Sequence, residues 1–280
     1  KNDVEINIKK AQKILKNGDL VIFPTETVYG LGGNATDGNA IKKIYKIKNR
    51  PINNPLICHF KNIENIEKNF FLSDISYKLA NKFWPGPLTL VLEKKDSSII
   101  SAKLSNQKKF VGCRIPNHPV AQKLLSGIPF PIAAPSANIS TKLSSTKINH
   151  LSKKLKENIF VLDGGKSFYG LESTVIYVNN NNPKILRLGS ITLEEIKKII
   201  PSIVLENYNN FSTLSPGQQI KHYSPNLPIR INVNSVLKGE ALLNFGTNNL
   251  KSEIIELNLS PTENFEEAGN NFYDYLHILD

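Results

Sequence analysis

The hydrophobic positions along the chain alternate between two patterns, helical spacing and short apolar runs typical of strands. Ile8, Ala11 and Leu15 recur at helical spacing, which predicts an amphipathic helix that ends at Asn17-Gly18. Helical spacing returns at 39–48 and 75–83. Short apolar runs predict strands at 20–23, 56–60, 88–93, 110–115, 132–134, 160–162, 173–178 and 184–188. Helices that alternate with strands in this way indicate an α/β fold.

The pattern changes near residue 207. Residues 207–228 have no period and are rich in Asn, Ser, Pro and Gly, which predicts a linker. Strand-like runs follow at 229–233, 241–245 and 253–259, and then a helix with Ser260 as its N-cap and Glu263 completing a capping box. We expect the apolar stripe of this helix to be Phe265, Ala268, Phe272, Leu276 and Leu279.

This pattern divides the chain into a larger domain at 1–206, a linker at 207–228 and a small α/β domain at 229–280. About fifty residues is close to the lower limit for independent folding. The chain also contains no Met and therefore no initiator. We accordingly expect the small domain to be incomplete.

Composition excludes several classes of protein. Hydrophobic residues make up 40% of the chain, but no apolar run approaches the ~18–20 residues that a membrane helix needs. Two cysteines are too few for a disulfide framework. We therefore expect a cytoplasmic protein with a sizeable core and no membrane partner.

Charge is distributed unevenly along the chain, whose formal net charge is +11. Residues 1–228 hold 32 cationic and 16 anionic side chains, whereas residues 229–280 hold 3 and 8. A basic body of this kind favours an anionic partner, either nucleic acid or a phosphorylated small molecule. Its cations are nearly all Lys, and the exceptions are Arg50, Arg114 and Arg187. Each lies beside turn-forming residues, where a planar, bidentate donor suits a phosphate or carboxylate.

Other candidate residues give weaker signals. The loop predicted at 24–33 presents Thr25, Thr27 and several glycines, but it matches neither the phosphate-binding P-loop nor the dinucleotide-binding fingerprint. Ser136 and Asn138 follow a predicted strand, and they could bind a ligand or simply form a turn. The histidines and cysteines lack zinc-ligand spacing. His59 taken alone is best interpreted as a satisfied core histidine.

Six segments of the body occur together in one order. They are 16–32 (KNGDLVIFPTETVYGLG), Lys48 to His59, Trp84-Pro85-Gly86-Pro87-Leu88-Thr89, Arg114-Ile115-Pro116, Pro135-Ser136-Ala137-Asn138 and Glu172-Ser173-Thr174-Val175. The six segments and their order closely resemble those of the Sua5/YciO/YrdC family. The linker run 215–225 resembles the segment typical of the long, two-domain Sua5 type. Asn49 and Ser224 stand where family members often have Gly and Ala.

The resemblance implies a YrdC-like twisted mixed sheet with helices around a basic cavity, followed by a small Sua5-type domain. It also implies an L-threonylcarbamoyladenylate synthase, a nucleotidyltransferase that converts L-threonine, bicarbonate or CO2 and ATP to threonylcarbamoyl-AMP and pyrophosphate. The product would pass to a tRNA threonylcarbamoyltransferase for t6A formation at position 37 of ANN-decoding tRNAs. Contact with the tRNA itself stays open.

The resemblance also assigns site residues, none of them a covalent nucleophile. Those expected to bind threonine are Thr27, His59, Arg114, Ala134 and Ser173. Those expected to bind ATP are Lys48, Arg50, Asn54, Ser136, Asn138, Ser144, Arg187, His222 and Tyr223. Mg²⁺ is expected on the ATP phosphates, and the linker is expected to close over the nucleotide as a lid.

Two alternatives remain. One is a non-catalytic RNA-binding protein of the same fold, although the arginines lie in loops with Ser, Thr and Asn and no RNA-binding motif is present. The other is the YrdC-like domain of hydrogenase maturation proteins, which would carry zinc-finger or acylphosphatase-like segments that this sequence lacks.

Overall fold

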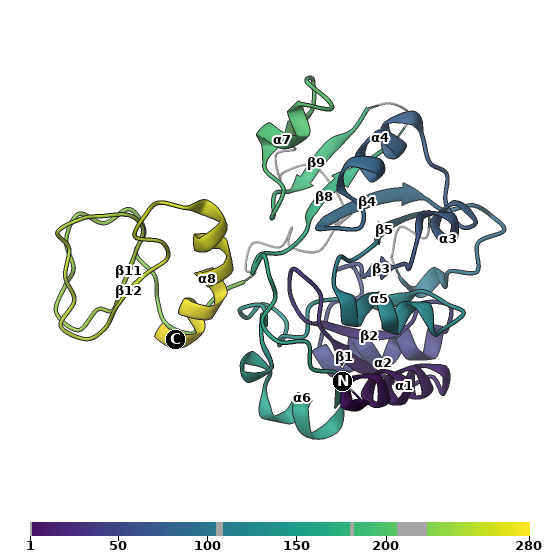
Figure 1. The fold of residues 1–280 in the computed structure, drawn as a ribbon, viewed down its shortest axis with the longest axis horizontal. Helices are drawn as coiled ribbons and strands as arrows, with labels where there is room; N and C mark the ends of the chain where they lie inside the picture. The colour runs from purple at the N-terminus through teal and green to yellow at the C-terminus, as the bar shows by residue number, and fades with distance from the viewer. Residues whose placement is uncertain (1, 105–108, 180–181, 206–222) are drawn as a thin grey trace.

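A computed structural model describes residues 2–104, 109–179, 182–205 and 223–280. Figure 1 shows a large body (residues 2–205) and a smaller C-terminal unit (residues 223–280), whose helix α8 lies next to the body. The helices are α1 (Asn2–Lys16), α2 (Gly38–Lys48), α3 (Ile63–Glu67), α4 (Asp74–Phe83), α5 (Pro119–Ser126), α6 (Lys153–Asn158), α7 (Leu193–Lys197) and α8 (Phe265–Leu279), with short 3-10 turns at Ala102–Leu104 and Ile148–His150.

The body is built on one ten-stranded mixed sheet. Its strands follow the order β10-β9-β8-β4-β5-β3-β6-β2-β1-β7, and parallel and antiparallel neighbours alternate along most of it. Their bounds are β1 (Val21–Phe23), β2 (Gly30–Asn34), β3 (Ile57–His59), β4 (Leu88–Glu93), β5 (Phe110–Arg114), β6 (Ile132–Ala134), β7 (Phe160–Val161), β8 (Thr174–Tyr177), β9 (Lys184–Arg187) and β10 (Val204–Leu205). This sheet confirms the predicted α/β class.

Alternate residues of each strand face opposite sides of the sheet, and the two sides bury different clusters. Ile22 of β1 belongs to the larger cluster, with apolar residues of α2, α4 and α7. Its neighbours Val21 and Phe23 belong to the smaller cluster, with residues of α1 and α5. On β3 and β5, Cys58 and Cys113 point into the larger cluster. His59 and Arg114, one residue further on each strand, are therefore directed to the other side.

The body contains the predicted strands and the three predicted helices, and also helices α3, α5 and α6 and strand β10, which the pattern did not predict. The loop expected at 24–33 needs a correction, because residues 30–34 form β2, which pairs with β1 and β6. A Cβ on Gly32 would lie 2.6 Å from the Ile132 side chain, and one on Gly33 would lie 2.7 Å from Leu20. The glycines are needed because side chains of neighbouring elements cross this strand closely.

The C-terminal unit departs further from the prediction. The strands expected at 241–245 and 253–259 are present as β11 (Leu242–Asn244) and β12 (Glu256–Asn258), and they pair in parallel. The expected strand at 229–233 is absent from this described segment, and Ile231 there is 78% exposed. Helix α8 begins at Phe265 with Asn264 as its N-cap, because Glu263 has a positive φ of 59° that ends any helix from Ser260. The expected capping box is therefore wrong.

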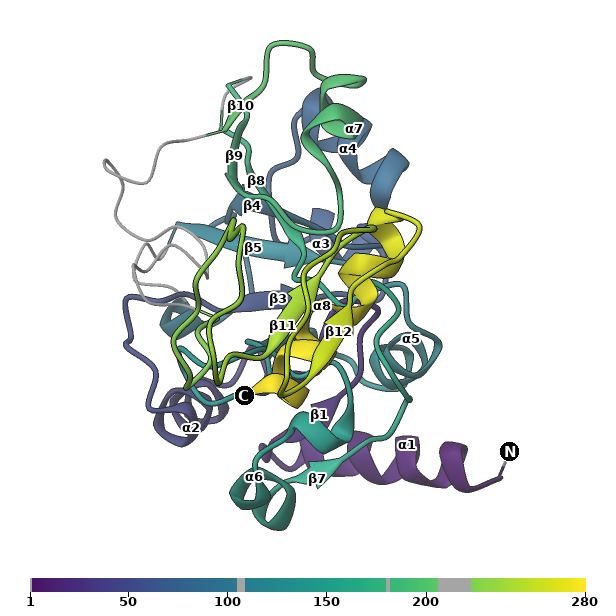
Figure 2. The same ribbon diagram turned by 90° about the vertical axis from the view of Figure 1, so that its left-hand side faces the viewer.

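Helix α8 contacts the body through a polar face. Asp274 lies 2.5 Å from Lys147, 3.1 Å from His150 and 3.2 Å from Lys166. The His277 ring stacks on His150 at 4.0 Å. Phe265, the first residue of the expected apolar stripe, is 82% exposed. In Figure 2 this helix lies in front of the large sheet, next to β11 and β12.

Most of the predicted linker, including His222, lies outside the described residues, so the lid remains a prediction. In the described part of the chain, no helix is long and apolar enough to cross a membrane.

Candidate functional site

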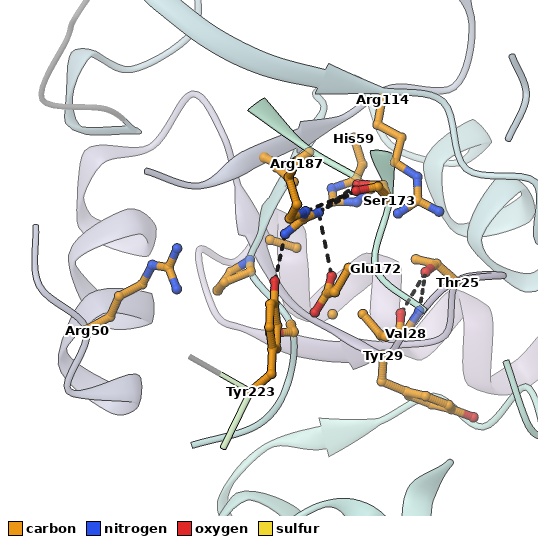
Figure 3. Close-up of a pocket in the computed structure, with 15 residues that line it drawn as sticks. Thr25, Val28, Tyr29, Arg50, His59, Arg114, Glu172, Ser173, Arg187 and Tyr223 are labelled. Carbon is orange, nitrogen blue, oxygen red and sulfur yellow. Dashed lines mark hydrogen bonds and ion pairs between the residues drawn. The ribbon is translucent and has the colours of Figure 1, made fainter. Parts of the chain in front are cut away.

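A cavity opens on the side of the sheet toward which His59 and Arg114 point. Figure 3 shows side chains from distant segments converging on it. Its lining residues are Thr25, Val28, Tyr29, Gly30, Arg50, Ile57, His59, Arg114, Ala134, Pro135, Ser136, Glu172, Ser173, Arg187 and Tyr223. All three arginines of the body are therefore in one place.

Arg114, at the end of β5, is almost fully buried. Its Nε donates to the Gly86 carbonyl at 3.3 Å, and its Nη1 donates to Thr27 Oγ1 at 2.8 Å. Its Nη2 lies 2.7 Å from Glu26 Oε1. Contacts on three sides fix the plane of the guanidinium, as recognition of a carboxylate by two parallel hydrogen bonds requires.

His59, at the end of β3, is a buried neutral imidazole. Burial, and then the nearby positive charge of Arg114, lower its pKa to about 3. Phe23 packs edge-on against the ring, with 5.8 Å between centroids. Nδ1 is buried and has no hydrogen-bond partner within the described residues. His59 is thus in the core, as its pattern suggested, and it also lines the cavity.

Arg50 lies just beyond the C-terminal end of α2. Asn49 adopts a left-handed conformation there (φ 48°), which Asn tolerates better than most residues and which explains why it can replace Gly. Arg50 Nε donates to the Asn54 carbonyl at 2.9 Å, and Nη2 donates to Asn54 Oδ1 and the Pro55 carbonyl. Burial lowers the pKa of Arg50 to about 10, so it stays cationic at neutral pH.

Lys48 supports the loop after β6. Its Nζ donates to the carbonyls of Ser136 at 2.5 Å and Asn138 at 2.6 Å. Ser136 Oγ in turn donates to Asn138 Oδ1 at 2.5 Å. Burial, together with the charge of Arg50, lowers the pKa of Lys48 well below its usual value. Lys48 therefore holds this loop in place beside the cavity and does not line it.

Arg187, at the end of β9, ties together the remaining predicted residues. It donates to the Ser173 carbonyl at 2.7 Å, to Ser173 Oγ at 3.1 Å and to the Tyr223 hydroxyl at 2.8 Å. Glu172 Oε2 lies 3.9 Å away, and Glu172 Oε1 accepts from Ser144 Oγ at 2.6 Å. Burial raises the pKa of Tyr223, so its hydroxyl stays protonated.

The structure thus brings most of the predicted site residues together. Those that line the cavity are Arg50, His59, Arg114, Ala134, Ser136, Ser173, Arg187 and Tyr223. Those that instead hydrogen-bond to lining residues or to their loop are Thr27, Lys48, Asn54, Asn138 and Ser144. His222 lies outside the described residues.

Two carboxylates at the site, the buried Glu26 and the partly buried Glu172, were not assigned from the sequence. Glu26 pairs with Arg114, and Glu172 lies near Arg187. Their position in the sequence could have indicated a role at the site. Each is an acidic residue of a basic body, and each lies beside hydroxyl side chains next to a strand. Neither belongs to a cluster of three or more His, Cys, Asp or Glu side chains suited to a metal ion, and the described residues contain no such cluster.

Comparisons with known proteins agree on one family. A Sua5/YciO/YrdC family model described as "Telomere recombination" matches residues 13–189. A model described as "Threonylcarbamoyl-AMP synthase, C-terminal domain" matches residues 191–280.

Curated relatives carry the same name. The threonylcarbamoyl-AMP synthase of Pyrococcus abyssi is 41% identical over 233 residues, which cover 80% of this chain and 67% of that protein. The Bacillus subtilis protein of the same name is 41% identical over 229 residues, covering 80% and 66%. The chain thus spans about two thirds of the length of these relatives.

Solved structures share the fold. The crystal structure of P. abyssi Sua5 complexed with L-threonine superposes with a TM-score of 0.84 at 33% identity, over 98% of this chain and 85% of that one. Escherichia coli YciO superposes with a TM-score of 0.61 at 21% identity over 68% of this chain and 92% of that one, a likeness of fold alone.

Proposed function

The chain belongs to the Sua5/YciO/YrdC family, and we propose that it is an L-threonylcarbamoyladenylate synthase. In this reaction L-threonine, bicarbonate or CO2 and ATP give threonylcarbamoyl-AMP and pyrophosphate. The amine of threonine bonds to CO2 and loses a proton, which forms a carbamate. A carbamate oxygen then bonds to the α-phosphorus, and the bond from that phosphorus to the pyrophosphate oxygen breaks.

The convergence of Arg50, Arg114 and Arg187 on one cavity is the observation that carries the proposal. The reaction joins two anions, a carbamate and a triphosphate, which repel each other until positive charge is placed between them. The three arginine residues are only 3–7% exposed, so their charges act on a ligand inside the cavity. Arginines buried this deeply suit the backbone of an RNA poorly, which disfavours the RNA-binding alternative.

The threonine half of the site lies around Arg114. Its guanidinium would take the substrate carboxylate, and Thr27 would hold that guanidinium in its plane. His59 would offer a neutral nitrogen to the amino acid, since its pKa of about 3 leaves it uncharged at neutral pH. Ser173, whose hydroxyl lies 2.8 Å from Thr89 Oγ1, and Ala134 would complete this half.

The nucleotide half lies around Arg50 and Arg187. These two cations would neutralise charge on the leaving pyrophosphate. Lys48 would keep the loop of Ser136 and Asn138 in position, and Asn54 and Ser144 would hold Arg50 and Glu172. Tyr223 and, from the linker, His222 would cover the nucleotide.

Mg²⁺ would enter on the phosphates of ATP. Magnesium in nucleotide sites is commonly held by one or two carboxylates together with substrate phosphates. Glu172 is the carboxylate among the lining residues, and it would take that part. The metal would supply further positive charge to the phosphates, and the binding and orientation would come from the side chains named above.

The product would be consumed by a tRNA threonylcarbamoyltransferase. Threonylcarbamoyl-AMP is a mixed anhydride that transfers its acyl group readily, and in this assignment the acceptor is N6 of adenosine 37 in ANN-decoding tRNAs. The same assignment would place the protein in the cytoplasm with its ATP and tRNA. Direct contact with tRNA is not needed for adenylate formation.

Calorimetric titration with threonine and ATP, each alone and then together, tests the proposal. We expect both ligands to bind, and ATP to bind more tightly once threonine and bicarbonate are present. Absence of threonine binding by the full chain under all these conditions would contradict it. Binding of RNA without either small ligand would instead support the RNA-binding alternative.

A further inference from the structure

Helix α8 packs against two loops of the body that lead to the cavity. The N–H of His277 Nε2 donates to the Ser144 carbonyl at 3.0 Å. Asn270 Nδ2 donates to the carbonyls of Ser167 at 3.2 Å and Phe168 at 2.5 Å. The first loop therefore holds one of the expected site residues, and the second leads into the site residues before β8.

Tyr273 is a deeply buried side chain of α8. It is 4% exposed, and its ring centroid lies 6.0 Å from that of Tyr223. Burial raises the pKa of its hydroxyl well above the usual value, and a hydrogen bond with the Ser144 side chain opposes this rise. The charges of Glu172 and Arg187 also act on this pKa, so Tyr273 lies close to both.

Two short chains of contacts lead from Tyr273 to the cavity. Along the first, Ser144 Oγ donates to Glu172 Oε1 at 2.6 Å. Along the second, the Tyr223 hydroxyl accepts from Arg187 Nη1 at 2.8 Å (Figure 3). Glu172, Arg187 and Tyr223 all line the cavity. Tyr273 therefore contacts the residues that hold the nucleotide half in place.

We propose that Tyr273 is a positioning residue of the nucleotide half, and that it couples the docking of α8 on the body to the binding of ATP. This inference rests on the proposed function. With α8 docked, the hydroxyl of Tyr273 holds Ser144, and its ring supports Tyr223. Without that contact Glu172 and Arg187 lose a fixed neighbour, so ATP should bind the undocked state less tightly.

Thermodynamic linkage makes this coupling reciprocal. A ligand that binds the docked state better must stabilise that state by the same factor, which is typically about 5- to 150-fold. Threonine should not show such coupling, because Arg114 is held within the body by Gly86, Thr27 and Glu26. Coupling is therefore expected with ATP and not with threonine.

The alternative is that Tyr273 only fills space between α8 and the body. Its loss would then weaken docking by the same factor with and without ATP. A positioning role predicts instead that the effect of ATP on docking becomes smaller. Protection of α8 amides from hydrogen exchange reports docking, so its measurement with and without ATP separates the two roles.

The experiment compares the full chain with its Tyr273→Phe variant, with ATP added alone so that no adenylate forms. In the unaltered protein we expect saturating ATP to raise the protection of α8 at least about fivefold. Tyr273→Phe should weaken ATP binding in calorimetry by about 3- to 10-fold, the net effect of one hydrogen bond. The rise in protection should shrink by the same factor, because both quantities report the ATP affinity of the docked state. Threonine affinity should be unchanged.

Asn270→Ala is the matched control on α8. It removes hydrogen bonds to the carbonyls of Ser167 and Phe168 and leaves the contact of Tyr273 with Ser144 in place. Protection of α8 should fall by the same factor with and without ATP, so the rise that ATP causes should be unchanged.

An equal rise with ATP in Tyr273→Phe and in the unaltered protein would overturn the inference and make Tyr273 a packing residue. Protection of α8 that ATP leaves unchanged in the unaltered protein would overturn it as well, and this measurement needs no variant. A rise that shrinks as much in Asn270→Ala as in Tyr273→Phe would also count against it, since any contact of α8 would then suffice. Failure of the unaltered protein to bind ATP would contradict the proposed function instead.

Discussion

The body and the C-terminal unit bury their residues in different ways. In the body, consecutive strand residues belong to clusters on opposite sides of one ten-stranded sheet. In the C-terminal unit, a two-stranded sheet leaves many large apolar side chains exposed, among them Ile231 and Ile254. Its helix α8 meets the body through Asp274 and His277. The body is therefore held by apolar packing, whereas the contact with α8 adds ion pairs and hydrogen bonds to ring stacking and to close packing of Gly269 on Leu171.

This difference explains where the periodicity of the sequence was informative. A residue pattern predicts an element well when burial of apolar surface selects it, as in β4 and β5. The residue pattern predicts the buried face of an element poorly when that face is polar. Of the stripe expected on α8, Ala268 is buried and Phe265 is exposed, and the helix also buries Gly269, Tyr273 and Asp274.

Truncation of a core residue should separate the two regions most strongly. Leu90 is fully buried in β4, so Leu90→Ala should lower the free energy of unfolding by about 2–5 kcal/mol through lost burial and a cavity. Ile231→Ala, in the C-terminal unit, should change it by less than about 0.5 kcal/mol. Chemical denaturation of both variants measures this. A similar loss for both would mean that Ile231 is covered in the folded protein.

Substitution in the site should affect binding more selectively than truncation of the core. Arg114→Lys keeps the charge but loses the planar fork, so threonine affinity should fall by about 10- to 100-fold, the loss of charged hydrogen bonds. ATP affinity should change far less, because Arg50 and Arg187 remain. Calorimetry with each ligand measures the two effects. Equal losses would show that Arg114 is not the carboxylate anchor.

The contact of α8 should weaken in mild acid. Burial, and then His277, lower the pKa of His150 to about 4, and burial lowers the pKa of His277. These groups bind fewer protons in the docked state, so docking is favoured above pH 6.5 and lost as the pH falls from 6.5 toward 4. The pKa of Asp274 is lowered by Lys147 and Lys166 against the effect of burial, so its ion pairs persist through this range.

Hydrogen exchange at pH 7 and pH 5, corrected for intrinsic rates, measures this weakening. Amides of α8 should lose protection at pH 5, while those of β4 and β5 should not. The double change His150→Gln and His277→Gln should remove the pH dependence. Protection of α8 that is the same at both pH values in the unaltered protein would contradict the role of the histidine pair.

The smallest expected effect is at the site itself. Because the pKa of His59 is about 3, its imidazole stays neutral from pH 5 to pH 8. Threonine affinity should therefore show no step near pH 6.5, unlike the protection of α8. Titrations across this range measure it. A step near 6.5 that disappears in His59→Gln would show that His59 is solvated and protonated in the folded protein.

Much of the site could be predicted from the sequence, for identifiable reasons. Arg50, Arg114 and Arg187 are exceptions in a Lys-rich body, and the cavity contains all three. Glu26 could not be assigned, because a carboxylate beside two threonines is equally typical of a turn. Its significance depends on Arg114, 88 positions away, which only the pairing of distant strands brings within 2.7 Å. The strand at Gly30–Asn34 was missed because its glycines serve packing with Phe23 and Ile132.

In the proposed reaction, the cavity joins threonine to ATP through a carbamate. Release of pyrophosphate from ATP, measured with the full chain and Mg²⁺, tests it most directly. We predict release only when threonine and bicarbonate are both present, and background levels when either is left out. Release at the full rate without threonine would show a plain ATP hydrolase and contradict the account.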